Sequence, residues 1–193
     1  MLQEDPKNLL VNIAKILKEL KIPYIITGGM AVLVWGRPRF TADIDIVVEL
    51  GQNKVDELEK ALLSLSDVGY FDKEAVQEAI NNKDEFNFID GNTGIKVDFW
   101  VLSDDSFDLS RFKRRKVKKV LGKNVYFSSP EDLILIKLKW YKKSLMSRQI
   151  EDVESILKIS DKKIDFKYLK KWAKKLDVLK ILEEVIKKTV VLD

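Results

Sequence analysis

The architecture of this chain follows from two stretches, TGGMA at residues 27–31 and RFTADIDIVV at residues 39–48. The first stretch follows IPYII at residues 22–26, a short apolar run that predicts a buried strand. A short helix is predicted next, so Gly28 and Gly29 fall where a strand becomes a helix. Two residues without a Cβ allow a tight turn that exposes consecutive N–H groups at a helix N-terminus, which attracts anions. We therefore expect an anion such as a phosphate to bind at this turn.

Acidic residues alternate with apolar ones in the second stretch. Asp43 and Asp45 are two positions apart in a β-favouring segment, so both side chains lie on one face while the isoleucines enter the core. A third acid, Asp98, lies in IKVDFWV at residues 95–101, which also predicts a strand, and it joins the other two if the strands are neighbours. Three clustered carboxylates repel one another and need a cation or a shared proton. Magnesium is the natural candidate because it prefers oxygen ligands.

Each of these features also has a plainer interpretation. A glycine pair after a strand is commonly just a turn, and acids at a strand edge are commonly solvated surface residues. The ordered combination of a glycine pair, a short helix, Arg39-x-Thr41-x-Asp43-x-Asp45 and a later strand aspartate favours a functional site over both interpretations.

These residues resemble the signature of the nucleotidyltransferase superfamily that includes DNA polymerase β. That signature is a Gly-Gly or Gly-Ser turn, an Asp-x-Asp strand and a third strand acid, here matched by Gly28, Gly29, Asp43, Asp45 and Asp98. More narrowly, the chain resembles the minimal nucleotidyltransferases related to the AbiEii toxin family. The resemblance covers about residues 20–160 and implies an α+β fold, a mixed sheet with flanking helices followed by a C-terminal α-helical region.

The resemblance also implies roles for residues in the helical region. SPEDLILIKLK at residues 129–139 is similar to the family's helix that carries a nucleotide-contacting lysine, which falls on Lys137. RQIED at residues 148–152 resembles the next helical motif and places Arg148 and Asp152 near the site. Two plainer interpretations stay open, a solvated lysine on a lysine-rich helix for Lys137 and a helix-surface acid for Asp152.

One departure from the family pattern concerns the turn. The family often has serine at the second position, whereas Gly29 supplies no hydroxyl, so phosphate contact there rests on backbone N–H groups. Arg39 and Thr41, which precede the acid pair, are included among the expected nucleotide-binding residues. For Arg39, an ordinary surface position is the open alternative.

The activity implied by the resemblance is Mg²⁺-dependent nucleotidyl transfer of the EC 2.7.7 type. A nucleoside monophosphate moves from an NTP to an acceptor hydroxyl and pyrophosphate leaves, with Asp43, Asp45 and Asp98 as the catalytic residues and the ligands of two Mg²⁺ ions. The acceptor is open among tRNA, a protein and a small molecule. Two alternatives remain: a catalytically silent nucleotide- or RNA-binding module, and a toxin–antitoxin interaction protein with a small antitoxin-like partner.

Composition narrows the chemistry further. The 193 residues are 46% apolar and 34% charged, typical of a globular protein, and they include no cysteine and no histidine. Disulfides, thiolate zinc sites, cysteine nucleophiles and histidine triads are therefore excluded. No apolar run reaches the roughly 18 residues that a membrane span needs, and the first residues are polar, unlike a secretory leader. We therefore expect a cytoplasmic protein with no membrane partner.

The pattern of elements changes at Pro130. Residues 6–20 predict an amphipathic helix, and apolar strand patterns follow it. Ser129 directly before Pro130 is typical of a helix start, and only helical patterns come after it. We expect a catalytic αβ domain at residues 1–128 and a helical region at residues 129–193.

Positive charge is concentrated in RFKRRKVKK at residues 111–119, in a chain whose 35 basic and 31 acidic residues give a net charge of +4. Such a run attracts nucleic acid or an acidic partner. A solvated edge strand, whose charges prevent edge-to-edge pairing, explains the run equally well. Both interpretations stay open.

Overall fold

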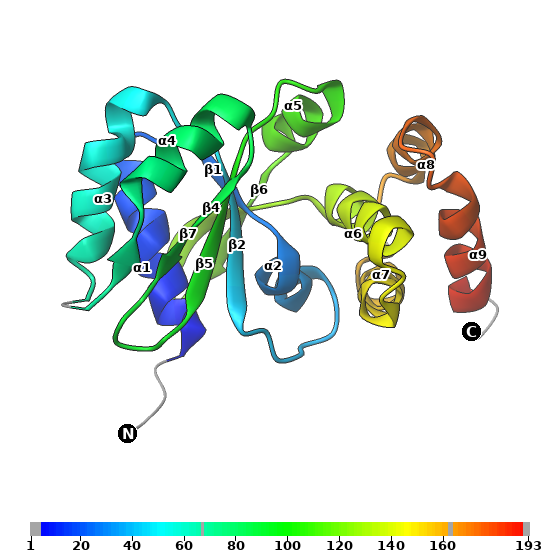
Figure 1. Cartoon of the computed structure of the whole chain (residues 1–193). Helices are drawn as coiled ribbons and strands as arrows, with labels where there is room; N and C mark the ends of the chain where they lie inside the picture. Colours follow the sequence, from blue (N-terminus) through cyan, green and yellow to red (C-terminus); the bar gives the residue numbers. More distant parts are fainter. Residues whose placement is uncertain (1–4, 67, 162–163, 191–193) are drawn as a thin grey trace. The chain divides into compact units, whose positions relative to one another are not determined.

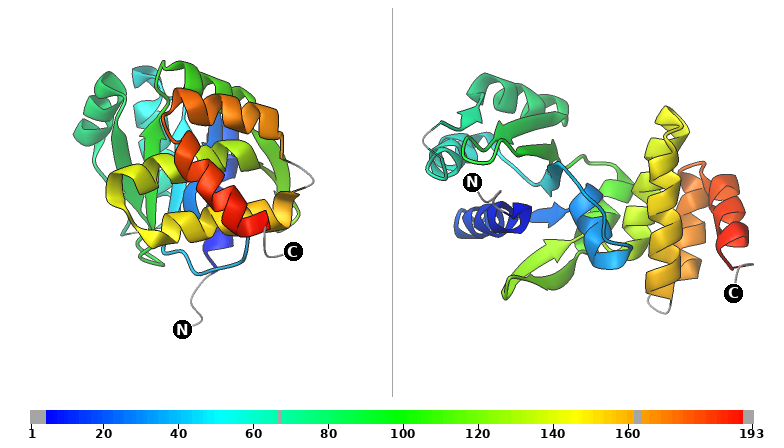
Figure 2. Two further views of the ribbon diagram at one scale, coloured as in Figure 1. Left: turned by 90° about the vertical axis from the view of Figure 1, so that its right-hand side faces the viewer. Right: turned by 90° about the horizontal axis from the view of Figure 1, so that it is seen from below.

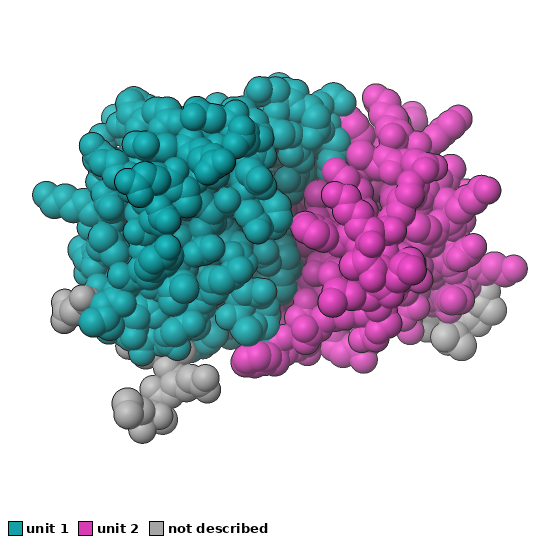
Figure 3. Space-filling model, in the orientation of Figure 1, with its two compact units in different colours: residues 1–30, 41–127 teal, residues 31–40, 128–193 magenta. Residues whose placement is uncertain are grey.

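The computed structural model describes residues 5–66, 68–161 and 164–190. The chain divides into two compact units, one of residues 1–30 and 41–127 and the other of residues 31–40 and 128–193 (Figure 3). One division therefore falls inside helix α2 (Gly28–Trp35), and another follows strand β7 (Lys123–Phe127).

The described residues of the first unit form a seven-stranded sheet of order β3-β4-β5-β2-β1-β7-β6 (Figure 1). The sheet is mixed, because β2–β5 and β1–β7 are parallel pairs and the other neighbours are antiparallel. Besides β7, its strands are β1 (Tyr24–Ile26), β2 (Asp43–Val48), β3 (Tyr70–Phe71), β4 (Glu85–Ile89), β5 (Lys96–Val101) and β6 (Lys116–Val120).

Residue alternation gives this sheet two different faces. Ile44, Ile46 and Phe99 are fully buried on one face, and Figure 1 shows α1 (Pro6–Glu19), α3 (Val55–Leu63) and α4 (Lys73–Asn82) along that side of the sheet. A 3-10 turn, η1 (Gln52–Lys54), leads into α3. On the opposite face, Val47 packs with Ile25 and with Phe112 of α5 (Ser106–Lys113). The acids of β2 share this second face, because they alternate with the buried isoleucines.

The second unit is helical beyond residue 128. It contains α6 (Pro130–Ser144), α7 (Ser147–Ser160), α8 (Phe166–Lys175) and α9 (Leu179–Val190). Helix α6 packs on α7 and α8, and both of these pack on α9 (Figure 2). The Ser129 hydroxyl accepts a hydrogen bond of 3.2 Å from the Asp132 N–H, and Pro130 opens α6, which confirms the predicted helix start. Among the described helices, none combines the length and the apolar character that crossing a bilayer requires.

Most predicted elements are confirmed, but α5 and β3 were missed. The predicted helix at residues 6–20 is α1, and part of the basic run at residues 111–119 lies in β6, at the edge of the sheet. The basic run is therefore not one strand. Its first residue, Arg111, lies in α5 and pairs with Asp108 at 2.7 Å.

Candidate active site

The predicted glycine turn begins α2 directly after β1. Gly28 has a φ of +57°, in the left-handed region that glycine adopts readily. A Cβ at this position would lie 1.8 Å from Asp45 Oδ2. The carboxylate of Asp45 therefore packs directly against the glycine backbone, and both the φ angle and this contact require glycine.

The second glycine makes room for a hydroxyl. A Cβ at Gly29 would lie 2.1 Å from Thr41 Oγ1. That hydroxyl donates a hydrogen bond of 2.9 Å to Asp43 Oδ1. A hydroxyl therefore does lie beside the second position of the turn, but it belongs to Thr41 and not to a turn serine.

The three predicted acids lie on two neighbouring strands. Strands β2 and β5 pair in parallel, with Asp45 beside Asp98 and Asp43 beside Lys96. Residues paired in this way project to the same face, and the strand axes are about 4.8 Å apart. The condition set by the sequence, that the two strands be neighbours, is met.

Lys96 is a residue of this region that the sequence analysis did not single out. Its Nζ lies 2.8 Å from Asp98 Oδ1, and its side chain is about half exposed, at 49%. The hydrogen bond to Asp98 raises the pKa of the Lys96 ammonium above its ordinary value, and Asp43 on the paired strand adds to the effect. The signal was present in the sequence, because residues two apart on a strand share a face.

The donor chemistry of this cluster fits magnesium. Among the described residues, no three acidic, histidine or cysteine side chains are already arranged as a metal site. Asp98 is hydrogen-bonded to Lys96, and Asp43 accepts from Thr41. The donors are nevertheless all carboxylate oxygens, and Mg²⁺ is usually held by one or two carboxylates together with substrate phosphates.

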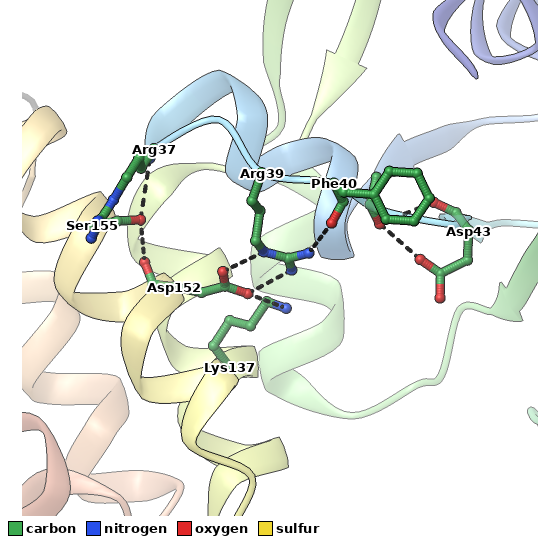
Figure 4. A network of polar contacts seen from close by, with 8 residues as sticks. Arg37, Arg39, Phe40, Asp43, Lys137, Asp152 and Ser155 are labelled. Atoms are coloured by element: carbon green, nitrogen blue, oxygen red, sulfur yellow. Dashed lines mark hydrogen bonds and ion pairs between the residues drawn. The ribbon is translucent and has the colours of Figure 1, made fainter. Parts of the chain in front are cut away.

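The second unit contains a buried ion-pair network centred on Asp152 of α7 (Figure 4). Arg39 Nε and Nη2 donate to the two carboxylate oxygens of Asp152 at 2.7 and 2.8 Å. Lys137 Nζ lies 2.9 Å from Asp152 Oδ2, and these Lys137 and Asp152 side chains are only 8% and 3% exposed. Burial alone would raise the pKa of Asp152, but the bonds from Arg39 and Lys137 outweigh burial and hold it below its ordinary value.

Further hydrogen bonds hold the segment before Arg39 on α7. The Ser160 hydroxyl donates to the Trp35 carbonyl at 2.6 Å, and the Arg37 N–H donates to Ser155 Oγ at 3.3 Å. Figure 4 shows Arg37 and Ser155 beside the Asp152 network. Two of the predicted nucleotide-binding cations, Arg39 and Lys137, are thus brought together, whereas Arg148 lies exposed in the first turn of α7 and outside this network.

Gly28→Ala is expected to lower the free energy of unfolding by about 3 kcal/mol or more, because it combines a strained φ with a collision against Asp45. Gly122→Ala is the matched control, since Gly122 also has a positive φ (+77°) but its Cβ would meet nothing within 4 Å. The control should lose only about 1–2 kcal/mol. Urea unfolding measures both values, and equal losses would show that Asp45 moves aside without cost.

Asp152→Ala is expected to lower the free energy of unfolding by about 3–5 kcal/mol, because two cations lose their buried counter-charge. Glu151→Ala, an exposed acid one residue away on the same helix, should change it by no more than about 0.5 kcal/mol. Urea unfolding at neutral pH makes the comparison. A loss below 1 kcal/mol for Asp152→Ala would contradict a stabilising network.

The same network predicts a pH dependence. The pKa of Asp152 is lower in the folded than in the unfolded protein. The contribution of Asp152 to the free energy of unfolding is therefore fully present above the pKa of the unfolded state, about 3.9, and is lost as the pH falls through the pKa of the folded state. The stability difference between wild type and Asp152→Asn should therefore shrink below about pH 4. Thermal unfolding as a function of pH measures it, and a constant difference would contradict the assignment.

Three solved structures resemble this chain over most of their length. The antibiotic-resistance factor ANT(2'')-Ia in solution has a TM-score of 0.57 and 15% identity, covering 98% of this chain and 96% of its own. The crystal structure of ANT(2'')-Ia in complex with adenylyl-2''-tobramycin has a TM-score of 0.56 and 17% identity, covering 92% and 95%. A nucleotidyltransferase-like protein from Paracoccidioides brasiliensis has a TM-score of 0.50 and 20% identity, covering 81% and 77%.

The likeness lies in the three-dimensional structure. No family model and no curated protein matches the sequence. Identities of 15 to 20% show a shared fold and no more. The chain has the α+β fold of these nucleotidyltransferases, a mixed sheet with flanking helices and C-terminal helices, which confirms the fold expected from its sequence.

Proposed function

We propose that the protein is a Mg²⁺-dependent nucleotidyltransferase that moves a nucleoside monophosphate from an NTP to an acceptor hydroxyl and releases pyrophosphate. One observation carries the proposal: the register of β2 with β5 puts Asp45 beside Asp98, on the face that Asp43 shares and against the Gly28 turn. The fold neighbour crystallised with adenylyl-2''-tobramycin supports nucleotidyl transfer as the reaction class.

The acids have roles that suit their positions. Asp43 and Asp45 would hold Mg²⁺, and Asp98 would complete the site of a second ion. Bound Mg²⁺ neutralises phosphate charge and lowers the pKa of an attacking hydroxyl. Asp98, mostly buried and adjacent to Asp45, is the proposed acceptor of the proton from the acceptor hydroxyl.

The turn supplies phosphate contacts of a different kind. Gly28 and Gly29 begin α2, so their backbone N–H groups belong to the unpaired donors at a helix N-terminus. The Thr41 hydroxyl, which lies against Gly29, can rotate from Asp43 to donate to a phosphate oxygen. This places a hydroxyl donor where the family pattern often has serine.

Arg39 and Lys137 are the proposed cationic contacts to the triphosphate, with Arg148 as a further candidate. Asp152 is a positioning residue in this proposal, because it holds both side chains by direct hydrogen bonds. Both cations contact the same carboxylate in this network. Arg39 is its most accessible member, with 23% of its side chain exposed.

Other parts of the proposal rest on sequence motifs and composition. These are the relation to AbiEii-related minimal nucleotidyltransferases, a small antitoxin-like partner and a cytoplasmic location. The acceptor class remains open here among RNA, a protein and a small molecule, because a catalytic motif does not define the pocket that selects an acceptor.

Calorimetry with each of the four ribonucleoside triphosphates, with and without Mg²⁺, tests the proposal. Wild type is expected to bind at least one of them only when Mg²⁺ is present, and Asp43→Asn to weaken this binding about tenfold or more, because a metal ligand loses its charge. Asp104→Asn, at an exposed acid of the same unit, is the control and should bind as wild type does.

Two results would contradict this expectation. Nucleotide binding that needs no Mg²⁺ and is unchanged in Asp43→Asn would indicate a catalytically silent binding module. If no triphosphate binds under either condition, the transferase proposal fails for the isolated chain.

Lys96→Gln is expected to tighten the binding of Mg²⁺ alone about fivefold, because it removes a positive charge hydrogen-bonded to Asp98. Fivefold corresponds to roughly 1 kcal/mol, the interaction of two unit charges about 4 Å apart in water. Lys60→Gln changes an exposed lysine of α3 and is the charge-matched control. Metal titration without nucleotide measures both, and unchanged affinity in Lys96→Gln would mean that the ammonium does not compete with the ion.

A further inference from the structure

The hairpin of β6 and β7 has an unusual distribution of charge. Residues 109–130 include no acidic residue and eight basic ones, namely Arg111, Lys113, Arg114, Arg115, Lys116, Lys118, Lys119 and Lys123. This charge exceeds the net +4 of the whole chain. Lys116, Lys119 and Lys123 form no ion pair with any described residue. Strand β6 is the last strand of the sheet, so Lys116 and Lys119 border an open edge, and Lys123 begins β7 at the hairpin turn.

One face of the hairpin also exposes apolar and aromatic groups. Val117 and Tyr126 are cross-strand partners that are 49% and 37% exposed. The next pair, Lys119 with Asn124, is exposed as well. The lysines alone would suffice to protect an edge strand from edge-to-edge pairing, and that role does not need an exposed aromatic ring. Exposed apolar and aromatic groups between lysines therefore argue for a contact surface.

The guanidinium group of Arg115 contacts two aromatic rings. Its guanidinium carbon lies 5.2 Å from the ring centre of Phe112 and 5.1 Å from that of Tyr126. An arginine in cation–π contact with two rings, one of which belongs to the exposed Tyr126, forms a platform on which a nucleobase can stack.

This platform lies on the sheet face that carries the acids. Phe112 packs with Ile25, Val47 and Trp100, and Val47 alternates with the buried isoleucines of β2 just as Asp43 and Asp45 do. The stack of Phe112, Arg115 and Tyr126 therefore extends from the acid-bearing face toward the sheet edge.

The strand register also fixes the level of the platform along the sheet. Ile46, Ile26, Phe127 and Lys116 lie in one row across β2, β1, β7 and β6. Three strand spacings correspond to about 14 Å. Asp45 directly precedes Ile46, so the start of β6 lies level with the acid pair, and the hairpin tip at Leu121 points to the other end of the sheet.

We propose that the β6–β7 hairpin binds a single nucleic-acid strand whose terminal hydroxyl is the acceptor of the transferred nucleotide. The hairpin surface is defined as Arg115, Val117, Lys119 and Tyr126 on the acid-bearing face, with Lys116 at the open edge and Lys123 at the hairpin turn, both of which alternate to the other face. The inference rests on the proposed function and names its acceptor class. Unpaired lysines match a phosphodiester backbone, and the Arg115–Tyr126 platform matches the faces of unpaired bases. An acidic protein segment would match the charge but would leave the aromatic platform unused.

The test is fluorescence anisotropy with a short labelled single-stranded RNA. A single-stranded DNA of the same sequence, measured in the same way, shows whether the surface prefers RNA or DNA. The triple variant Lys116→Gln, Lys119→Gln and Lys123→Gln should bind at least tenfold more weakly. A plot of log affinity against log salt concentration should have a slope that is shallower by about 2 for this variant, because each of the three lost phosphate contacts contributes roughly 0.7 to the slope. Lys167→Gln, Lys170→Gln and Lys174→Gln make the same charge change on exposed positions of α8 and should bind as wild type does.

The stacking contribution has its own pair of variants. Tyr126→Ala should weaken RNA binding about tenfold, and Tyr126→Phe should restore it, because stacking needs the ring and not the hydroxyl. Thermal unfolding identifies any variant that fails to fold, and the lysine variants then carry the test.

The outcomes separate this inference from the proposed function. Equal RNA binding by the β6–β7 and α8 lysine variants would overturn the inference. Polyglutamate that displaces the labelled RNA as well as unlabelled RNA does would also overturn it, in favour of an acidic protein partner. Calorimetry of Mg²⁺ and NTP on the same variants should match wild type, because none of the substitutions touches the acids. If Asp43→Asn still binds RNA, the hairpin surface is supported even if nucleotide binding fails. If the protein binds nucleotide but not RNA, the inference is overturned and the proposed function is left intact.

Discussion

The close approach of acidic side chains to a backbone without side chains is the constraint on which the site depends. Asp45 occupies the space that a Cβ of Gly28 would take, and Thr41 occupies the corresponding space at Gly29. The strand that carries the acids can therefore start directly beside the first turn of α2. The partial positive charge of that helix terminus offsets some of the repulsion among the carboxylates. A larger residue would push the turn away from Asp45 at Gly28 and from Thr41 at Gly29.

Each unit contains a cluster of charged side chains, and the two clusters differ in composition. In the first unit, three acids on one sheet face are accompanied by the ammonium of Lys96. In the second, Arg39 and Lys137 share the single carboxylate of Asp152. A cluster of acids favours a metal ion, and arginine and lysine side chains favour phosphate oxygens. In the proposed function, the acids match the metal ions of a metal–triphosphate complex and the two cations match its phosphates.

Sequence patterns predicted most of the fold because its elements are strongly periodic, as in α1 and β2. Helix α5 was missed because SFDLSRFK has no regular apolar face, although Asp105 gave a capping signal and does accept from the N–H groups of Phe107 and Asp108. Alternation could have placed Lys96 beside Asp98. No local pattern could have paired Arg39 with Asp152, which lie 113 positions apart, because that contact depends on tertiary packing.

The extent of strand pairing differs between the acid-bearing strands and the β6–β7 hairpin of the first unit. Strands β2 and β5 pair along the whole length from Asp43 to Val48, so the acids are fixed in register. Among the described residues, β7 pairs with β1 only through Ile26 and Phe127, and an edge contact between the rings of Tyr24 and Tyr126 adds to this connection. Local opening is least costly where backbone pairing is sparse. Such a hairpin can adjust to nucleic-acid strands of different sequence while the acids stay in register, which suits the surface proposed above.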